Sequence, residues 1–407
     1  MPWKSPMIKA VLLDLDDTLL SNPADNFEQS LEGWNTFFGQ RTGLLNAGQG
    51  MAAALQAVVH NLDPTRSNLD VYLSVLSEQW KMPEAAILEH FQVFYGEVYA
   101  HLEKLVSPRE AAPGLVEWLR AMGYQVVIAT NPFFTAEAVA QRLAWAGLPT
   151  DLKAYALVTH IGNMHFTKPN PHYYEEILGR LGVANDEAIM VGDDWVRDIV
   201  AAEQAGLHTY WIREDDAQPG PAQAQPDGQG TLNDFALRVC NLSWLDTLKP
   251  RPLRPSMIIP RLLGNVGALF GLLDQYTPDY WQQHPDPNEW SPLEVVCHLR
   301  DSERTVQRPR LETIAREDNP FLSVPKEPPG PGQIACDVVH YGDPAEEFAA
   351  ERQKTITFLQ SLPPEAWYRP ARHSIFGPTT LLEMANFTAT HDRLHLQQIC
   401  LTMGSCS

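Results

Sequence analysis

Three short apolar runs, each ending at polar residues, constrain the fold of this 407-residue chain most strongly. They are 8–13 (IKAVLL), 125–130 (QVVIAT) and 188–191 (AIMV). Such runs are typical of strands buried on both faces of a parallel sheet. Helical patterns lie around them, at 114–122, 134–146 and 172–182. Because strands alternate with helices, we predict an α/β fold with a parallel sheet.

The rest of the chain is predicted to be helical. Residues 22–109 contain helical patterns broken by Gly, Pro and Asn, at 27–39, 49–60, 68–79 and 83–103. Helical patterns recur near the C-terminus at 257–275, 291–317, 344–361 and 379–402. No convincing strand follows residue 256, and a Pro/Gly-rich loop lies near 319–342. We expect a helical insertion in the α/β part, followed by an all-α four-helix bundle.

These patterns divide the chain into domains. We expect a core from residues 1–21 and 110–248, an inserted helical cap from 22–109 and a bundle from 257–407. Residues 249–256 (KPRPLRPS) are basic and rich in proline, as in an extended linker. Residues 214–230 are loop-like by composition.

Charge and cysteine usage narrow the class of function. Thirty Lys and Arg against 50 Asp and Glu give a net charge of −20, which does not suit a protein that binds nucleic acid through its phosphates. The five cysteines are an odd number and widely spaced. They do not indicate a disulfide framework, and they fit a reducing compartment.

No segment is predicted to be a signal peptide or a membrane span. Asp14, Asp16 and Asp17 interrupt the N-terminal apolar stretch. The most apolar later stretch, 257–273, contains Arg261 and is too short to cross a bilayer. We therefore expect a cytoplasmic protein with no membrane partner.

Polar side chains follow the first two predicted strands. Asp14 and Asp16 come directly after the first strand, and Thr130 and Asn131 end the second. Ligands of parallel sheets gather at the carboxyl ends of the strands. Two acids so placed can divide nucleophilic and proton-transfer work, and a hydroxyl and an amide suit phosphate oxygens.

Two later segments add charged groups. Lys168 precedes a predicted helix and offers a point charge for a phosphate. The third strand leads into acids suited to a hard cation, namely Asp193, Asp194 and Asp198. Alone, Thr130 is more simply a strand-end hydroxyl and Asp17 a turn residue. Together these segments predict a phosphate and metal site.

Four segments resemble, in order, the motifs of the haloacid dehalogenase-like (HAD) phosphohydrolase superfamily, over roughly residues 8–248. They are the DxDxT segment at Asp14, Thr130, Lys168 and the GDDxxxD segment. The resemblance implies a Rossmann-like core. It implies that Asp14 attacks phosphorus to form an aspartyl-phosphate and that Asp16 is the general acid and base. Thr130, Asn131 and Lys168 would contact the substrate phosphate.

The same resemblance implies a Mg²⁺ site. Its ligands would be the carboxylates of Asp14 and Asp193 and the main-chain carbonyl of Asp16, with Asp194 or Asp198 in or near the shell. True haloacid dehalogenases lack an acid at the position of Asp16, because halide departure needs no proton. A phosphatase acting on a small phosphorylated metabolite, such as a nucleotide or sugar phosphate, is therefore favoured. A phosphomutase stays open, because an aspartyl-phosphate can also transfer to another hydroxyl.

The bundle carries a second group of candidate ligands. His391 and His395 are four residues apart, on one face of a predicted helix, and His298 lies in another. Three neutral imidazoles can bind Zn²⁺, Ni²⁺ or a related ion and leave a coordination position open. Alone, each histidine is more simply a buried, hydrogen-bonded residue.

The surrounding segments, WSPxExxxHLxDxE and HDxxHxxQI, resemble the DinB-like bundle family over roughly residues 257–404. That family includes metal-dependent thiol transferases. The resemblance implies metal ligation by His298, His391 and His395, but no substrate. Two alternatives stay open: the bundle carries the main activity as a metal-dependent transferase or hydrolase, or it is only a binding or homodimerisation module.

Overall fold

The computed structural model describes residues 8–22, 24–214, 218–242, 244–323, 330–334, 336, 342–402 and 404, except the side chains of 24–32 and 242. Parts of the predicted loops at 214–230 and 319–342 lie outside these ranges. The chain divides into two compact units, Met1–Tyr173 with Val183–Arg251, and Tyr174–Gly182 with Pro252–Ser407. Residues 174–182, which the sequence places in the core, thus group with the second unit.

A six-stranded parallel sheet forms the centre of the first unit, in the order β5-β4-β1-β6-β7-β8. The strands are β1 (Ala10–Leu13), β4 (Gln125–Ile128), β5 (Leu157–Val158), β6 (Ala188–Gly192), β7 (His208–Ile212) and β8 (Gly228–Gly230). The predicted α/β fold is confirmed. β7 was missed, because HTYWI opens with His and Thr and gives no apolar run. In register, Leu13 pairs with both Ile128 and Val191, so these three strands end side by side.

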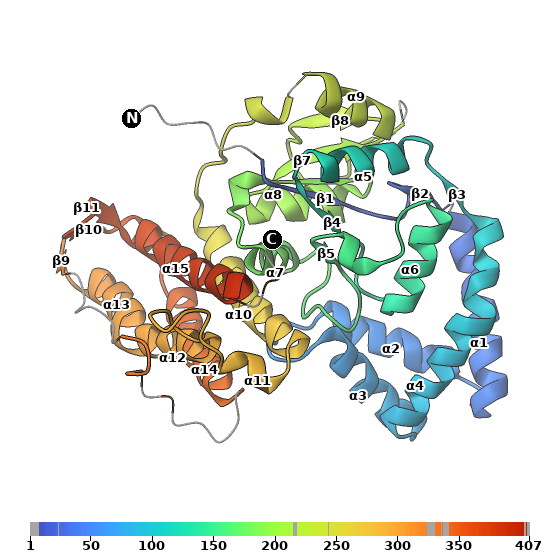
Figure 1. Cartoon of the computed structure of the whole chain (residues 1–407), viewed down its shortest axis with the longest axis horizontal. Helices are drawn as coiled ribbons and strands as arrows, with labels where there is room; N and C mark the ends of the chain where they lie inside the picture. Colours follow the sequence, from blue (N-terminus) through green and yellow to red (C-terminus); the bar gives the residue numbers. More distant parts are fainter. Residues whose placement is uncertain are drawn as a thin grey trace. The chain divides into compact units, whose positions relative to one another are not determined.

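Along the chain, helices alternate with the strands of the sheet and follow the last of them (Figure 1). They are α5 (Ala111–Ala121), α6 (Ala136–Trp145), α7 (Pro171–Leu181), which groups with the second unit from Tyr174 on, α8 (Ala201–Ala205) and α9 (Leu232–Leu242). Alternate strand residues such as Val11, Leu13 and Ile128 are fully buried in one cluster with residues of α5 and α9. Leu12 and Val127, which point to the other face, are also fully buried. Burial on both faces explains why the strands read as continuous apolar runs.

The insertion after β1 is helical, as its sequence predicts. It comprises α1 (Ala24–Thr42), α2 (Ala47–Val59), α3 (Asn68–Trp80) and α4 (Glu84–Val93), followed by irregular helical turns to Leu105. Its core is aromatic, and Phe38 and Phe94 are almost fully buried in it. The chain leaves through β2 (Leu20–Ser21) and returns through β3 (Ser107–Pro108), which pair antiparallel. We call α1 to Leu105 the cap.

The second unit contains four long helical segments, drawn in yellow to red in Figure 1. They are α10 (Ile258–Gln275), α12 (Pro292–Ser302) with its continuation α13 (Arg308–Arg316), α14 (Asp343–Gln360) and α15 (Leu381–Thr402). As predicted, α12 begins at a capping box formed by Ser291 and Glu294. The expectation of no strand here is wrong: β9 (Phe321–Leu322), β10 (Pro370–His373) and β11 (Gly377–Thr380) form a small sheet. These strands are too short to give a periodic pattern.

The stretch Pro255–Gln275 is longer than the apolar stretch read from the sequence. Its most apolar window of 18 residues has a mean hydropathy of 1.5, and the helix of 21 residues could cross a membrane by length and composition alone. The argument that this stretch is too short is therefore wrong. However, 78% of the most apolar window is buried inside the structure, which is also typical of the core helix of a bundle.

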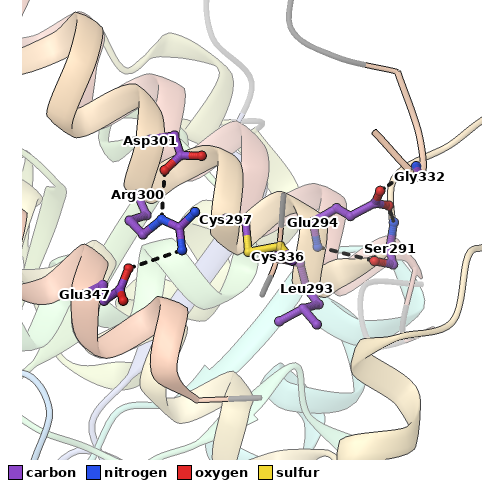
Figure 2. Close-up of a disulfide and its surroundings, with 9 residues drawn as sticks. All are labelled: Ser291, Leu293, Glu294, Cys297, Arg300, Asp301, Gly332, Cys336 and Glu347. Atoms are coloured by element: carbon purple, nitrogen blue, oxygen red, sulfur yellow. Dashed lines mark hydrogen bonds and ion pairs between the residues drawn. A yellow bond between two sulfur atoms is a disulfide. The ribbon is translucent and has the colours of Figure 1, made fainter. Parts of the chain in front are cut away.

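One disulfide joins Cys297 in α12 to Cys336, 39 residues further along the chain (Figure 2). Nearby, the Gly332 N–H donates to Oε1 of Glu294 over 2.6 Å. Gly332 and Cys336 are therefore both held to α12. The bond departs from the expectation drawn from cysteine usage, because an odd number of widely spaced cysteines indicates no pairing.

Candidate active site and candidate metal centre

The candidate nucleophile Asp14 lies where β1 ends. Its N–H donates to the carbonyl of Val191 in β6 over 2.9 Å, and the residue is only 8% exposed. Because β1 lies between β4 and β6, Thr130 and Asp193 follow the two neighbouring strands. The parallel register thus brings three predicted site segments to one sheet edge.

Lys168 bridges two acids of this edge. Its Nζ donates to Oδ1 of Asp14 over 2.7 Å and to Oδ1 of Asp198 over 2.6 Å. The lysine is 2% exposed and lies in the connection between β5 and α7. A buried ammonium between two carboxylates is charge-compensated, and it fixes the orientation of Asp14.

Three carboxylates converge beside Lys168. Ligand oxygens of Asp14, Asp193 and Asp198 all lie within 4.8 Å of one another. Burial, and then the neighbouring acids, raise the pKa of Asp193. Burial also raises the pKa of Asp198, against the opposing effect of Lys168. The buried carboxylates of Asp14 and Asp198 and the half-buried one of Asp193 share a single ammonium, and a hard cation bound by oxygen would supply further positive charge.

Gly192 makes this convergence possible. A Cβ on Gly192 would lie 2.3 Å from Oδ2 of Asp198, so any other residue would displace that carboxylate. Asp194, by contrast, is not in the cluster. Its Oδ1 accepts the N–H groups of Val196 and Arg197 at 2.9 and 2.8 Å, which caps the helical turn that follows β6. Of the two acids offered for the outer shell, the structure therefore brings Asp198 to the cluster.

Two residues that the sequence did not single out, Thr159 and Tyr173, fix the backbone where β4 ends. The carbonyl of Thr130 accepts from Oγ1 of Thr159 at 2.7 Å and from the hydroxyl of Tyr173 at 2.9 Å. Next to it, Oδ1 of Asn131 is buried without a hydrogen-bond partner among the described residues. A buried polar atom left unpaired in this way is suited to a bound ligand or water.

Asp16 has a partner that no motif predicted. Its carboxylate forms an ion pair with Arg142, which lies in α6 and is 3% exposed. Burial lowers the pKa of Arg142 to about 10, so the guanidinium stays charged at neutral pH. It also lies over the ring of Phe134, 4.8 Å from the centroid. In the sequence, Arg142 stands beside the core residue Leu143 and resembles an ordinary helix-surface arginine.

A cavity of about 560 Å³ lies between the cap and the core. Cap residues such as Leu69, Phe91 and Tyr95 line one side, and Thr135 and Gln141 line the other. Nε2 of Gln141 donates to the carbonyl of Tyr95 over 3.0 Å. The cap is thus in direct contact with α6, the helix that carries Arg142.

The three histidines predicted from the second part of the chain also meet. Ligand nitrogens of His298 in α12 and of His391 and His395 in α15 lie within 4.8 Å of one another. Burial and the neighbouring imidazoles lower the pKa of His298 and of His395 to about 4. These two rings are therefore neutral at pH 7, the form in which histidine binds metals.

Other side chains hold this cluster in place. The ring of Trp290 lies 4.8 Å from that of His298, and Nδ1 of His395 lies 3.0 Å from Oε1 of Gln398. Among the nearby acids, Asp301 pairs with Arg300. Glu303 and Asp392 both pair with the buried Arg352, and Oδ1 of Asp392 lies 3.9 Å from Nδ1 of His391.

Comparisons with known proteins agree with the resemblances read from the first and the second part of the sequence. Residues 8–206 match the family model of haloacid dehalogenase-like hydrolases, and residues 265–399 match that of the DinB superfamily. The chain is 26% identical to pyrophosphatase PpaX of Halalkalibacterium halodurans, over 51% of this chain and 87% of that protein. It is 28% identical to a glyceraldehyde 3-phosphate phosphatase of Methanopyrus kandleri, over 57% and 93%. A crystal structure of a HAD phosphatase from Thermococcus onnurineus is 20% identical, with a TM-score of 0.39 over 57% and 98%.

The two family models thus assign residues 8–206 to the HAD-like hydrolases and residues 265–399 to the DinB superfamily. Both resemblances read from the sequence are confirmed. The curated relatives above are named as phosphatases, which agrees with a phosphoric monoester hydrolase.

Proposed function

We propose that the first unit is a Mg²⁺-dependent phosphatase that hydrolyses a small phosphorylated metabolite through an aspartyl-phosphate. One observation carries this proposal: Lys168 joins the nucleophile Asp14 to a buried cluster of acids at the carboxyl ends of the strands. Phosphoryl transfer mainly needs positioning and charge neutralisation, and this arrangement supplies both.

The reaction has two steps. In the first, an oxygen of Asp14 bonds to phosphorus, and the bond to the leaving oxygen breaks with its electron pair on that oxygen, which takes a proton from Asp16. In the second, Asp16 accepts a proton from water as the water oxygen bonds to phosphorus. The bond from Asp14 to phosphorus then breaks and releases inorganic phosphate. Lys168, Thr130 and Asn131 hold the phosphoryl oxygens.

The acid cluster fits a magnesium ion. Asp14 and Asp193 would hold it through carboxylate oxygens, with the carbonyl of Asp16, while Asp198 orients Lys168 and stays nearby. When bound, Mg²⁺ would neutralise charge on the phosphoryl group. Burial, and then the neighbouring acids, raise the pKa of Asp193, and burial raises that of Asp198. A bound cation would favour the charged form of both groups, which supports this assignment.

A panel of phosphate esters, tested on the intact chain with metal analysis of the same preparation, tests this proposal. We expect release of phosphate that requires Mg²⁺, and its loss in a folded Asp14→Asn variant. Full activity in that variant would contradict the assignment of Asp14 as the nucleophile. Product analysis with a hexose phosphate distinguishes a phosphatase from a phosphomutase. A phosphatase would release free sugar, whereas a phosphomutase would yield an isomerised ester.

For the second unit we propose a transition-metal site formed by His298, His391 and His395. The neutral, clustered imidazoles support it, and Zn²⁺ or Ni²⁺ fits three such ligands. We expect about one metal ion per chain, lost when His391 and His395 become alanine. Whether the bundle is catalytic is tested by assaying that variant on the same ester panel, where an unchanged phosphatase rate would assign the chemistry to the first unit.

A further inference from the structure

Arg142 is a buried cation that the chemistry proposed above does not use. It is 3% exposed, and its Nη2 pairs with Asp16. Its Nη1 is buried and has no hydrogen-bond partner among the residues that the structure describes. A guanidinium has five donors, and leaving one of them buried and unpaired costs free energy unless a ligand completes it.

The partner of Arg142 tells which side of the substrate it faces. In the proposed function, Lys168 and Thr130 hold the phosphoryl group that is transferred, and Asp16 gives its proton to the leaving oxygen. A guanidinium paired with Asp16 therefore lies on the leaving-group side. Oδ1 of Asp16 is also buried without a hydrogen-bond partner in the described part of the chain. Nη1 of Arg142 and Oδ1 of Asp16 could therefore both hydrogen-bond to a ligand.

The cap controls access to this position. Phe134, which lies against Arg142, contacts two aromatic rings of the cap, those of Trp34 at 6.1 Å and Tyr99 at 5.8 Å. The cap is joined to the core by the short β2–β3 pair. A substrate that enters while the cap is open would thus be enclosed with its leaving group beside Arg142.

We propose that Arg142 binds a second anionic group of the substrate, a phosphate or a carboxylate a few bonds from the leaving oxygen. This inference rests on the proposed function and deepens it. The substrate class it names is a small compound with two anionic ends, such as a phosphoanhydride or a phosphorylated hydroxy acid. A guanidinium suits either anion, because its parallel N–H groups match the two oxygens of such a group.

Two matched pairs of probes test the inference on the full chain with Mg²⁺. Phosphoglycolate is compared with ethyl phosphate, and pyrophosphate with p-nitrophenyl phosphate; only the first member of each pair carries a second anion on the leaving side. For Arg142→Met we expect kcat/KM to fall about 10- to 100-fold more for the charged member than for its uncharged partner. The pair with the larger difference identifies the anion as carboxylate or phosphate.

Equal losses within both pairs would overturn the inference, because a residue acting only through Asp16 would affect all esters alike. Arg142→Lys serves where the methionine variant does not fold. It keeps the charge but loses the paired donors, and we expect the same selective loss, about tenfold.

Calorimetric binding to the Asp14→Asn protein separates the subsite from turnover. We expect phosphoglycolate to bind more tightly than ethyl phosphate, and adding Arg142→Met to remove the difference. If the wild-type chain hydrolyses no probe but this difference is present, the proposed function fails and the anion subsite stands. Equal affinities for phosphoglycolate and ethyl phosphate would contradict the proposed anion subsite.

Discussion

Nζ of Lys168 donates a hydrogen bond to Oδ1 of Asp14 over 2.7 Å, and so joins two residues that are 154 positions apart. The same ammonium reaches Asp198. One positive charge therefore serves both the candidate nucleophile and the candidate metal cluster, which ties phosphate binding to cation binding in a single buried group.

Replacing Lys168 by methionine should reduce kcat/KM for p-nitrophenyl phosphate by at least about 100-fold, the usual effect of removing one group that stabilises the transition-state charge. Asp14 would also lose its fixed orientation. Lys168→Arg is the matched control, because it keeps the charge and should retain more activity. A methionine variant within tenfold of the wild type would contradict this role.

Asp193→Asn should have opposite effects without and with magnesium. Without Mg²⁺, the variant should melt at a higher temperature than the wild type, because the substitution removes a half-buried carboxylate that repels those of Asp14 and Asp198. With Mg²⁺, the wild type should gain stability and the variant should not. Thermal melts in chelator and in excess Mg²⁺ measure both effects, and Asp194→Asn, outside the cluster, should keep the Mg²⁺-induced shift. Equal Mg²⁺-induced shifts in Asp193→Asn and the wild type would remove Asp193 from the metal site.

Gly192→Ala should destabilise the first unit and weaken its Mg²⁺ response. The new methyl group would lie 2.3 Å from Oδ2 of Asp198, and overpacking of this kind costs about 1–3 kcal/mol. Gly114→Ala in α5 is the control. Nothing lies within 4 Å of its Cβ position, so it should stabilise the helix by about 0.5–1 kcal/mol. Melting temperatures of both variants test the contrast, and a neutral Gly192→Ala would show that Asp198 can move freely.

The sequence predicted the parts of the site that lie next to strand ends. Asp14, Thr130 and Asp193 follow apolar runs, and parallel pairing then dictates that they meet. Arg142 could not be found in this way. Its role depends on the direction in which one helix residue points, and the apolar pattern of α6 does not distinguish a buried arginine from a surface one.

The same limit explains the errors in the second unit. The three histidines were found because helical spacing places His391 and His395 on one face. The disulfide between Cys297 and Cys336 joins residues 39 positions apart, and no local pattern indicates that they meet. The two-residue strand β9 likewise exists only through pairing with the distant β10, and no local pattern encodes such pairing. Strands β10 and β11 form a local hairpin, but each has only four residues, too few to give a periodic pattern.

The disulfide predicts a redox-dependent stability of the second unit. Closing a loop of this length contributes about 2–4 kcal/mol by constraining the unfolded chain. Denaturation of the wild-type chain should therefore shift to lower denaturant concentration when dithiothreitol is added. Cys336→Ser should match the reduced wild type and be insensitive to the reductant. Peptide mapping without reduction should recover Cys297 joined to Cys336, and its absence would contradict the bond.

Acid should destabilise the metal-free bundle. Burial lowers the pKa of His298 and of His395 to about 4, whereas an unfolded histidine takes up its proton near pH 6.5. Between these values the unfolded state binds more protons than the folded state, so stability is complete above about pH 6.5 and falls as the pH drops toward 4. Denaturant melts in chelator at intervals from pH 7 to pH 4.5 measure this slope.

A variant with both His298→Gln and His395→Gln should show a flatter profile over the same range, because it lacks the two groups whose protonation differs between the states. Adding Zn²⁺ or Ni²⁺ should raise the stability of the wild type most at pH 7, and the gain should shrink on acidification, since protons and metal compete for the same nitrogens. An equally steep profile in the double variant would place the acid sensitivity elsewhere, and a metal gain independent of pH would exclude imidazole ligands.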